Sequence, residues 1–320
     1  MPELDGEASQ TFETPSLDQL LRISIELSDK EKLHEEALVD RKLEMSDEDK
    51  EFLRKAMGTR DDGTLKSDGD RIREALAGLA QPAATLERRE YALDLLLFLA
   101  EDVDNACDLA KMDGGEAIAP LLAALDDEAP SLRMGAAWIL GTMAQNNPPP
   151  QKALVAKGVL PKVLAMADDA AAPVVVRQRA LLCVSSLARD GSAGEAAFAD
   201  ASGFGVLGRL LGADVDGGLR TRALFLLRHL AVSSEAMRAA ALAAALVAPC
   251  SELVRTAGAF DCDAREKAAQ ALAALAGGVG GADADLVAAA NERLRQIAAI
   301  TDQDEREDCE EEARTLQFNI

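Results

Sequence analysis

Residues 133–144 read RMGAAWILGTMA, and related twelve-residue stretches occur at residues 89–100, 177–188, 220–231 and 265–276. Each copy begins with arginine and ends with alanine, and successive arginines stand 44, 44, 43 and 45 residues apart. Three, seven and ten residues after each arginine, the chain carries alanine or a larger apolar residue. These offsets fall on one face of an α-helix, so we expect every copy to form a helix that buries this face.

A helical repeat of roughly 40–47 residues is typical of armadillo and HEAT arrays. The sequence therefore predicts an all-α fold, an armadillo-like right-handed superhelical solenoid of about five repeats. Gly115, Gly158 and Gly203 each precede an apolar run, 17 to 19 residues before an arginine. This second pattern predicts the turn between the first two helices of a repeat. The fifth repeat lacks the glycine and continues through Ala245.

Charge divides the chain into three predicted parts. Residues 1–70 hold 10 Lys+Arg and 20 Asp+Glu, residues 71–282 hold 20 and 25, and residues 283–320 hold 4 and 11. We expect an acidic, flexible region over 1–70 with a short amphipathic helix near 16–28, an armadillo domain over 71–276, and a Gly-rich break with an acidic capping helix over 277–320. A net charge of −22 argues against nucleic acid as the ligand, because phosphate binding needs a basic stripe.

Catalytic and metal-binding patterns are not found in the sequence. The two histidines, His34 and His229, lie far apart, and the five cysteines are scattered without a C-x-x-C pair. We therefore predict no enzyme, no cofactor and no metal site, with reduced thiols throughout. The first residues do not form a secretory signal, and the most apolar stretch is too short to span a bilayer. These observations predict a cytoplasmic monomer that does not bind membranes.

The repeated helices have a second face, at offsets 2, 6, 9 and 13 from the leading arginine. In armadillo arrays the corresponding helix lines the concave groove, so we expect these positions to contact a partner. Offset 2 carries the cations Arg179, Arg222 and Lys267, and offset 9 carries His229. Cations in a groove of an acidic protein favour a partner with an acidic or carbonyl-rich surface, although pairing with neighbouring carboxylates is the open alternative. Trp138, the only tryptophan, is a candidate interface anchor or a core residue.

Several segments resemble the Fes-type nucleotide exchange factors, the armadillo proteins that bind heat-shock chaperones. The resemblance rests on Asp104-Asn105-Ala106, on Trp138-Ile139-Leu140-Gly141-Thr142, and on Ala144-Gln145-Asn146-Asn147-Pro148. Residues 176–181 and 219–223 are also similar, as is the opening segment 17–25. The similarity covers residues 16–276; the charged arm, the alanine-rich fifth repeat and the C-terminal tail depart from the family pattern.

The resemblance implies a co-chaperone that binds the ATPase domain of a cytosolic seventy-kilodalton, DnaK-type heat-shock chaperone. Binding would displace one lobe, open the nucleotide cleft and release ADP. Ala106 and Arg222 are the positions most expected at the contact. The other expected contact residues are Asn105, Trp138, Gly141, Thr142, Gln145, Asn146, Arg179, His229 and Lys267.

The resemblance also implies that a short N-terminal stretch imitates a chaperone substrate and helps release clients. The matching aliphatic residues here are Leu20, Leu21, Ile23 and Ile25. The same composition suits an ordinary amphipathic helix that docks on the solenoid, so both interpretations stay open.

Another function is compatible with the fold, namely an armadillo adaptor for extended peptides, or a scaffold unrelated to chaperones. Peptide-binding grooves of that kind repeat a Trp followed by an Asn four residues later on successive repeats. This chain has one Trp, and the residue four positions after it is Thr142. The spacing therefore argues against the adaptor.

Overall fold

The computed structural model describes residues 66–189, 192–255 and 262–276, with a few further positions between 292 and 314. The chain divides into two compact units, Met1–Arg71 and Ile72–Ile320. The predicted helix near 16–28, with Leu20, Leu21, Ile23 and Ile25, lies outside the described residues. Almost all of the predicted C-terminal capping helix lies outside them too. The three-part division of the chain stays a prediction.

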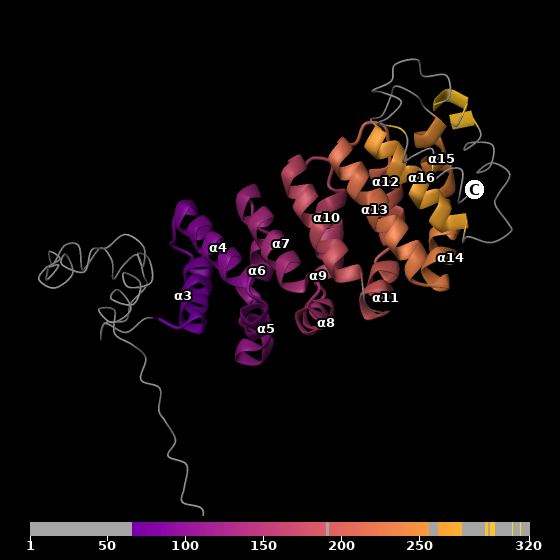
Figure 1. The fold of residues 1–320 in the computed structure, drawn as a ribbon. Coiled ribbons are helices and arrows are strands. Elements are labelled where there is room, and N and C mark those ends of the chain that lie inside the picture. The colour runs from indigo at the N-terminus through magenta and orange to yellow at the C-terminus, as the bar shows by residue number, and fades with distance from the viewer. Residues whose placement is uncertain are drawn as a thin grey trace, which may run out of the picture. The chain divides into compact units, whose positions relative to one another are not determined.

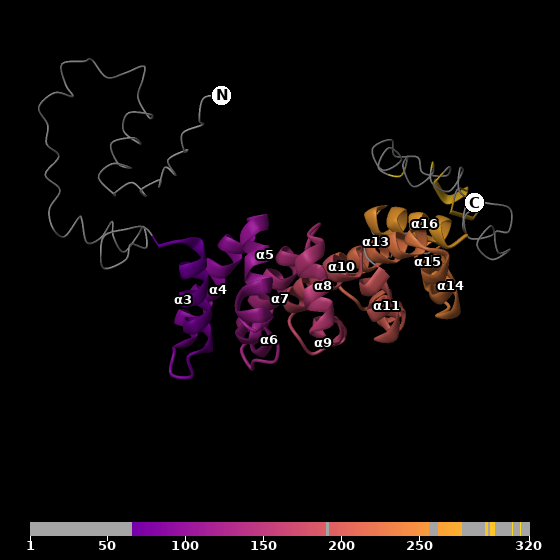
Figure 2. The same cartoon turned by 90° about the horizontal axis from the view of Figure 1, so that it is seen from below.

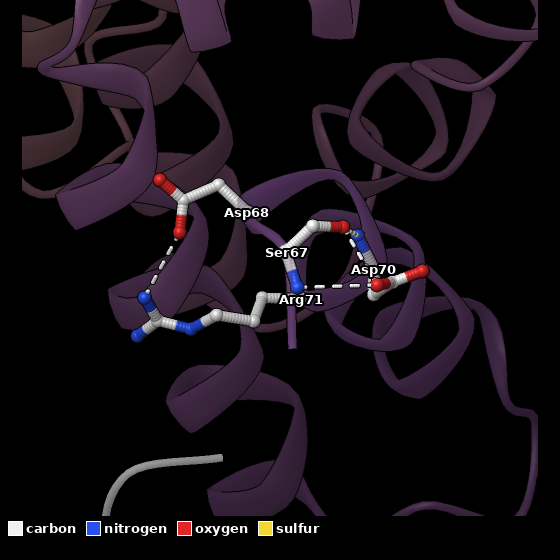
Figure 3. Close-up of polar contacts among 4 residues, drawn as sticks. All are labelled: Ser67, Asp68, Asp70 and Arg71. Carbon is white, nitrogen blue, oxygen red and sulfur yellow. Dashed lines mark hydrogen bonds and ion pairs between the residues drawn. The ribbon is translucent and has the colours of Figure 1, made fainter. Parts of the chain in front are cut away.

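The first described helix, α3 (Asp68–Ala80), starts with a capping box. Ser67 N donates to Asp70 Oδ2 at 3.1 Å, and Asp70 N donates back to Ser67 Oγ at 3.2 Å. The Ser67 hydroxyl also donates to Asp70 Oδ2 at 2.6 Å, and Arg71 pairs with Asp68 at 3.1 Å (Figure 3). These contacts satisfy backbone N–H groups that would otherwise lack a partner at the start of the helix.

The arginine-led stretches form one row of helices packed side by side in chain order (Figures 1 and 2). Each contacts the next helix of the row. We call this row the ladder; its members are α4 (Leu86–Ala100), α7 (Pro130–Ala144), α10 (Val174–Ala188), α13 (Gly217–Ser233) and α16 (Cys262–Ala276).

Two shorter helices precede each later member of the ladder. The first helices of the repeats are α5 (Val103–Lys111), α8 (Pro148–Ala156), α11 (Ser192–Asp200) and α14 (Glu235–Ala243), and each contacts the next along this row. The second helices are α6 (Ala119–Ala124), which follows the 3₁₀ turn η2 (Met112–Gly115), and α9 (Val159–Asp168), α12 (Gly203–Leu210) and α15 (Val247–Arg255). Along residues 66–276, as far as the structure describes them, four units of three helices follow the pair α3 and α4, which confirms the predicted all-helical armadillo-like fold.

The predicted buried stripe is confirmed in every repeat. Ala136 and Ala180, at offset 3, are both 0% exposed, and the residues at offsets 7 and 10 are buried throughout. Offset 6 was expected to face the groove, and this was wrong for α7, α10, α13 and α16. Ile139, Cys183, Leu226 and Ala271 are fully buried, because these helices bury a wider arc than one stripe. Positions 2, 5 and 9 form the more exposed face instead, although Ser186, at offset 9 of α10, is buried.

A left-handed residue stands at each turn between the first and second helices of a repeat. Gly115 and Gly158 have φ of 88° and 71°, which agrees with the sequence pattern. In the next repeat Ser202 (φ 59°) takes this conformation, while a Cβ on Gly203 would come within 2.4 Å of the Phe198 ring. Ala245 (φ 58°) occupies the same place in the fifth repeat, at a cost of about 1–2 kcal/mol relative to ordinary helical backbone.

The leading arginine of several repeats caps the helix before it. Arg89 Nε donates to Leu79 O at 3.3 Å, and Arg177 Nε donates to Ala167 O at 3.0 Å. Arg220, only 5% exposed, donates through Nη2 to three carbonyls just beyond α12, those of Gly212, Ala213 and Val215, at 3.0, 3.0 and 2.6 Å. Carbonyl groups near a helix C-terminus lack intrahelical partners and carry partial negative charge, so a guanidinium stabilises them.

Removing this cap should unfold the chain at lower temperature. Arg220→Ala leaves three carbonyls without their charged donor, and we expect a loss of about 1.5–3 kcal/mol in the free energy of unfolding. Thermal and urea denaturation followed by circular dichroism measure it. Arg228→Ala, at an exposed position of the same helix, is the control and should change stability by less than about 0.5 kcal/mol. Equal stability of the two variants would contradict the capping role.

Candidate partner-binding face

The outward side of the ladder is the candidate site, and we call it the ladder face. It comprises the residues at offsets 2, 5 and 9 of α4, α7, α10, α13 and α16. An α-helix turns about 100° per residue, so these three offsets point in nearly the same direction. Because the ladder helices pack side by side in order, the face continues from one repeat to the next (Figure 1).

Three of the predicted site residues come together at the middle of this face. The guanidinium carbon of Arg179, on α10, lies 3.4 Å from the centre of the Trp138 ring on α7. Burial lowers the pKa of Arg179, and the nearby positive charge of Arg222 lowers it further. Within the described residues, neither Arg179 nor Arg222 forms an ion pair. The Trp138 ring is therefore covered by the guanidinium of Arg179, and Arg222 adds a second positive charge nearby.

Close packing of α7 against α10 holds this cluster in place. A Cβ at Gly141 would lie 3.1 Å from Cys183 Cα and 3.3 Å from Cys183 Cβ, so a side chain there would require α10 to move by a few tenths of an ångström. Cys183 is fully buried, and burial raises the pKa of its thiol to about 12. Gly141 was predicted to contact a partner, but it is buried and its place is in the helix interface.

The remaining predicted residues of α7, α13 and α16 are distributed along the same side. Thr142 and His229 are half-buried on the ladder face, and Gln145 and Asn146 are exposed where α7 ends. Lys267, on α16, pairs with Glu266 at 2.8 Å and Asp263 at 3.6 Å. The hydrogen bond that Lys267 donates to the Glu266 carboxylate is the main cause of the raised pKa of Lys267. The sequence left open whether these cations meet a partner or pair with neighbouring carboxylates, and Lys267 pairs with carboxylates of its own helix.

Asn105 and Ala106 lie elsewhere, on α5 in the row of first helices. Asn105 is half-buried, and Ala106 is 1% exposed within the hydrophobic core. The methyl group of Ala106 is covered in this structure, and the expected place of Ala106 at the contact stays a prediction. An arginine at position 106 would disrupt packing rather than test a surface contact.

Two kinds of residue were not among the named contact residues, although Tyr91 and Phe98 stand at offsets expected to face a partner. Exposed aromatic rings stand at ladder-face offsets, namely Tyr91 (70% exposed), Phe98 (64%) and Phe225 (43%). Buried amides also connect the repeats. Asn147 Nδ2 donates to Val103 O at 3.4 Å, and Gln151 Nε2 donates to the carbonyls of Ser186, Leu187 and Arg189 where α10 ends. Their signal in the sequence is a polar residue within an apolar helical pattern.

The described part of the chain offers no group of three or more His, Cys, Asp or Glu side chains that could hold a metal ion. Within the same residues, no single helix is long and apolar enough to cross a bilayer. Only the pair α14 and α15 meets the length and composition criteria together, and it is bent by 76°. Cys107, Cys183, Cys250 and Cys309 are free thiols.

Two family models match overlapping, consecutive parts of the sequence. Residues 17–109 match the model of the nucleotide exchange factor Fes1, and residues 105–249 match the SIL1/FES1/HPBP1 C-terminal domain. The chain belongs to the SIL1/FES1/HPBP1 family. The resemblance drawn from the sequence motifs is thereby confirmed.

Relatives in the SIL1/FES1/HPBP1 family include Hsp70-binding protein 1 of Macaca fascicularis, 32% identical over 222 residues, or 66% of this chain and 60% of the relative. The human Hsp70-binding protein 1 is similar to the same extent. The Hsp70 nucleotide exchange factor FES1 of Kluyveromyces lactis is 36% identical over 119 residues, or 37% of this chain and 40% of the relative. The chain thus spans about 60% or less of the length of these relatives.

Solved structures with the same fold are armadillo-repeat solenoids. A designed armadillo repeat protein in complex with a (KR)4 peptide aligns with a TM-score of 0.60 and 17% identity, covering 77% of this chain and 99% of its own. An engineered protein aligns with a TM-score of 0.63 and 19% identity, covering 77% and 98%. At this level of identity the likeness concerns the fold alone.

The Trp138 stack provides a spectroscopic test of the site, since no other tryptophan contributes to emission. In Arg179→Ala the ring loses its guanidinium cover, and we expect red-shifted Trp138 emission with a loss of about 0.5–1 kcal/mol in stability. Fluorescence spectra and thermal denaturation measure the two effects. Lys152→Ala, at an exposed position on α8, should leave both unchanged. Emission of Arg179→Ala identical to the parent protein would contradict the stack.

Proposed function

We propose that this chain is a non-catalytic co-chaperone that acts in the cytoplasm as a monomer. It binds the ATPase domain of a seventy-kilodalton, DnaK-type heat-shock chaperone through the ladder face and accelerates the release of ADP. Membership of the SIL1/FES1/HPBP1 family carries the proposal, since its relatives are named as Hsp70-binding proteins and Hsp70 nucleotide exchange factors. The cluster of Trp138, Arg179 and Arg222 supports a protein-binding surface.

The two adjacent guanidiniums indicate what this surface recognises. Burial and the nearby positive charge of Arg222 both lower the pKa of Arg179, so an anion placed beside the two guanidiniums would favour the charged form of Arg179. A carboxylate of the partner would supply this anion and accept charge-assisted hydrogen bonds from both side chains. Trp138 beneath Arg179 fixes the orientation of one guanidinium before binding, so less side-chain entropy is lost on association.

Exchange needs no chemical step on this protein. The ATPase domain of the chaperone holds ADP tightly when its lobes are closed and weakly when they are open. A partner that binds the open arrangement better shifts the population towards it by the ratio of its two affinities. A ratio of 100 corresponds to about 2.7 kcal/mol, which is within reach of a few buried aromatic and arginine contacts. The proposed role is therefore differential binding by a preformed surface.

ADP release is the direct test. Fluorescent ADP is loaded on a purified DnaK-type chaperone, and its release is followed with and without this protein. The variant Arg179→Ala/Arg222→Ala removes both free cations, and each lost charged hydrogen bond should weaken binding about tenfold or more. Arg228→Ala serves as a control with the same change of charge per site. No acceleration by the parent protein would contradict the proposal and favour the peptide adaptor or scaffold.

The release of clients is the second part of the proposal, and it assigns Leu20, Leu21, Ile23 and Ile25 to the peptide-binding groove of the chaperone. The family match beginning at residue 17 supports it. Deletion of residues 1–30 should lower the release of a bound client peptide and leave ADP release nearly unchanged. Substitution of Leu20, Leu21 and Ile25 by Ser should act like the deletion. A lower melting temperature of the truncated protein would instead indicate a helix that docks on the solenoid.

A further inference from the structure

The ladder face changes charge from one end to the other. Adding offset 12 to offsets 2, 5 and 9 keeps all four positions within about 80° of the helix circumference. On α4 they carry two aromatic and two acidic residues, on α7 no charge, on α10 two arginines, and on α13 one arginine. The residues are Tyr91, Asp94, Phe98 and Glu101 for α4; Gly135, Trp138, Thr142 and Gln145 for α7; Arg179, Leu182, Ser186 and Arg189 for α10; and Arg222, Phe225, His229 and Val232 for α13.

The acidic end of the face on α4 exposes large apolar area together with uncompensated charge. Tyr91 is 70% exposed and Phe98 is 64% exposed, more than any other aromatic side chain among the described residues. Asp94 and Glu101 are both exposed, and within the described residues neither forms an ion pair. Exposed aspartates 104 and 108 on the adjacent α5 add to the negative potential. We call Tyr91, Asp94, Phe98 and Glu101 the acidic–aromatic patch.

We propose that the acidic–aromatic patch is a second anchor for the partner, and that it receives a basic surface element with an apolar depression for Tyr91 and Phe98. The proposal rests on the proposed function, and its occupant is the same ATPase domain that meets Arg179 and Arg222. The partner's surface then carries positive charge opposite α4 and negative charge opposite α10 and α13. A partner turned end for end would meet like charges at both anchors, so the gradient fixes the orientation of docking.

The chemistry of the patch supports an anchor rather than a solvated surface. Tyrosine and other aromatic residues concentrate binding energy at interfaces because they bury much area with few rotatable bonds. Carboxylates beside them attract a basic partner and raise the rate of encounter, and salt screens this effect over about 10 Å at 0.1 M. Substitution of the aromatic residues should therefore change mainly the dissociation rate constant. Substitution of the carboxylates should change mainly the association rate constant.

The experiment measures association and dissociation of the full chain with a purified DnaK-type ATPase domain by surface-based kinetics at several salt concentrations. Tyr91→Ala/Phe98→Ala should raise Kd by about tenfold or more, mainly through faster dissociation. Asp94→Lys/Glu101→Lys should slow association about three- to tenfold at low salt, with the difference vanishing at high salt. Controls are Leu242→Ala, a 45% exposed apolar residue on α14, and Asp200→Lys, an exposed acid on α11.

The outcomes separate this inference from the proposed function. Loss of binding in the patch variants and not in the controls, with unchanged melting temperatures, supports the second anchor. Patch variants that bind like the parent, while Arg179→Ala/Arg222→Ala binds weakly, overturn the anchor and leave the proposed function standing. A parent protein that does not bind the ATPase domain overturns both. A parent that is a dimer, and becomes a monomer in Tyr91→Ala/Phe98→Ala, assigns the patch to a second copy of this chain and overturns the inference.

Discussion

Hydrogen bonds between the leading arginine and the end of the helix that precedes it stabilise three of the repeats, those that begin with Arg89, Arg177 and Arg220. A helix end leaves carbonyl groups without partners, and in a short helix such as α12 these are a large share of all its backbone groups. Arg220 donates to three carbonyls just beyond α12, and Arg89 and Arg177 each donate to one carbonyl near the end of α3 and α9. Arg89 also reaches forward to Asp127 at 2.7 Å, just before α7. One guanidinium thus fixes the angle between two helices and helps to place the next repeat.

This constraint explains why the most regular cations of the sequence are structural. The arginine at offset 0 is turned towards the neighbouring helix end, and the arginine two positions later, at Arg179 and Arg222, is turned outward. Arginine therefore has two roles in the array, at two positions of the repeat helix that are separated by about 200° of rotation about the helix axis. Periodicity alone distinguishes them, since residue type does not.

The fold was predictable because small and apolar residues recur with helical spacing, and burial of Ala136 and Ala180 follows from that spacing alone. The outward face was only partly predictable. Offset 6 lies at the edge of the buried arc, and its burial depends on how much of the helix the neighbouring repeats cover, which no single repeat states. Ala106 shows a different limit, since a motif that matches a family does not state how deeply its methyl group is buried. Tyr91 and Phe98 were visible in the sequence, but only the packing shows that they remain exposed.

Gly141 has a consequence that reaches beyond its own contact with Cys183. In a solenoid each repeat is positioned only by its neighbour, so a change of angle at one interface is carried by every repeat that follows. A side chain at position 141 would push α10 outward at one point of its length, and this tilt would act as a lever on α13 and α16. A displacement of tenths of an ångström at the pivot would grow along the array and alter the spacing of residues several helices away. The absence of a side chain at Gly141 therefore sets the spacing of α7 and α10, and through it the arrangement of the later ladder helices.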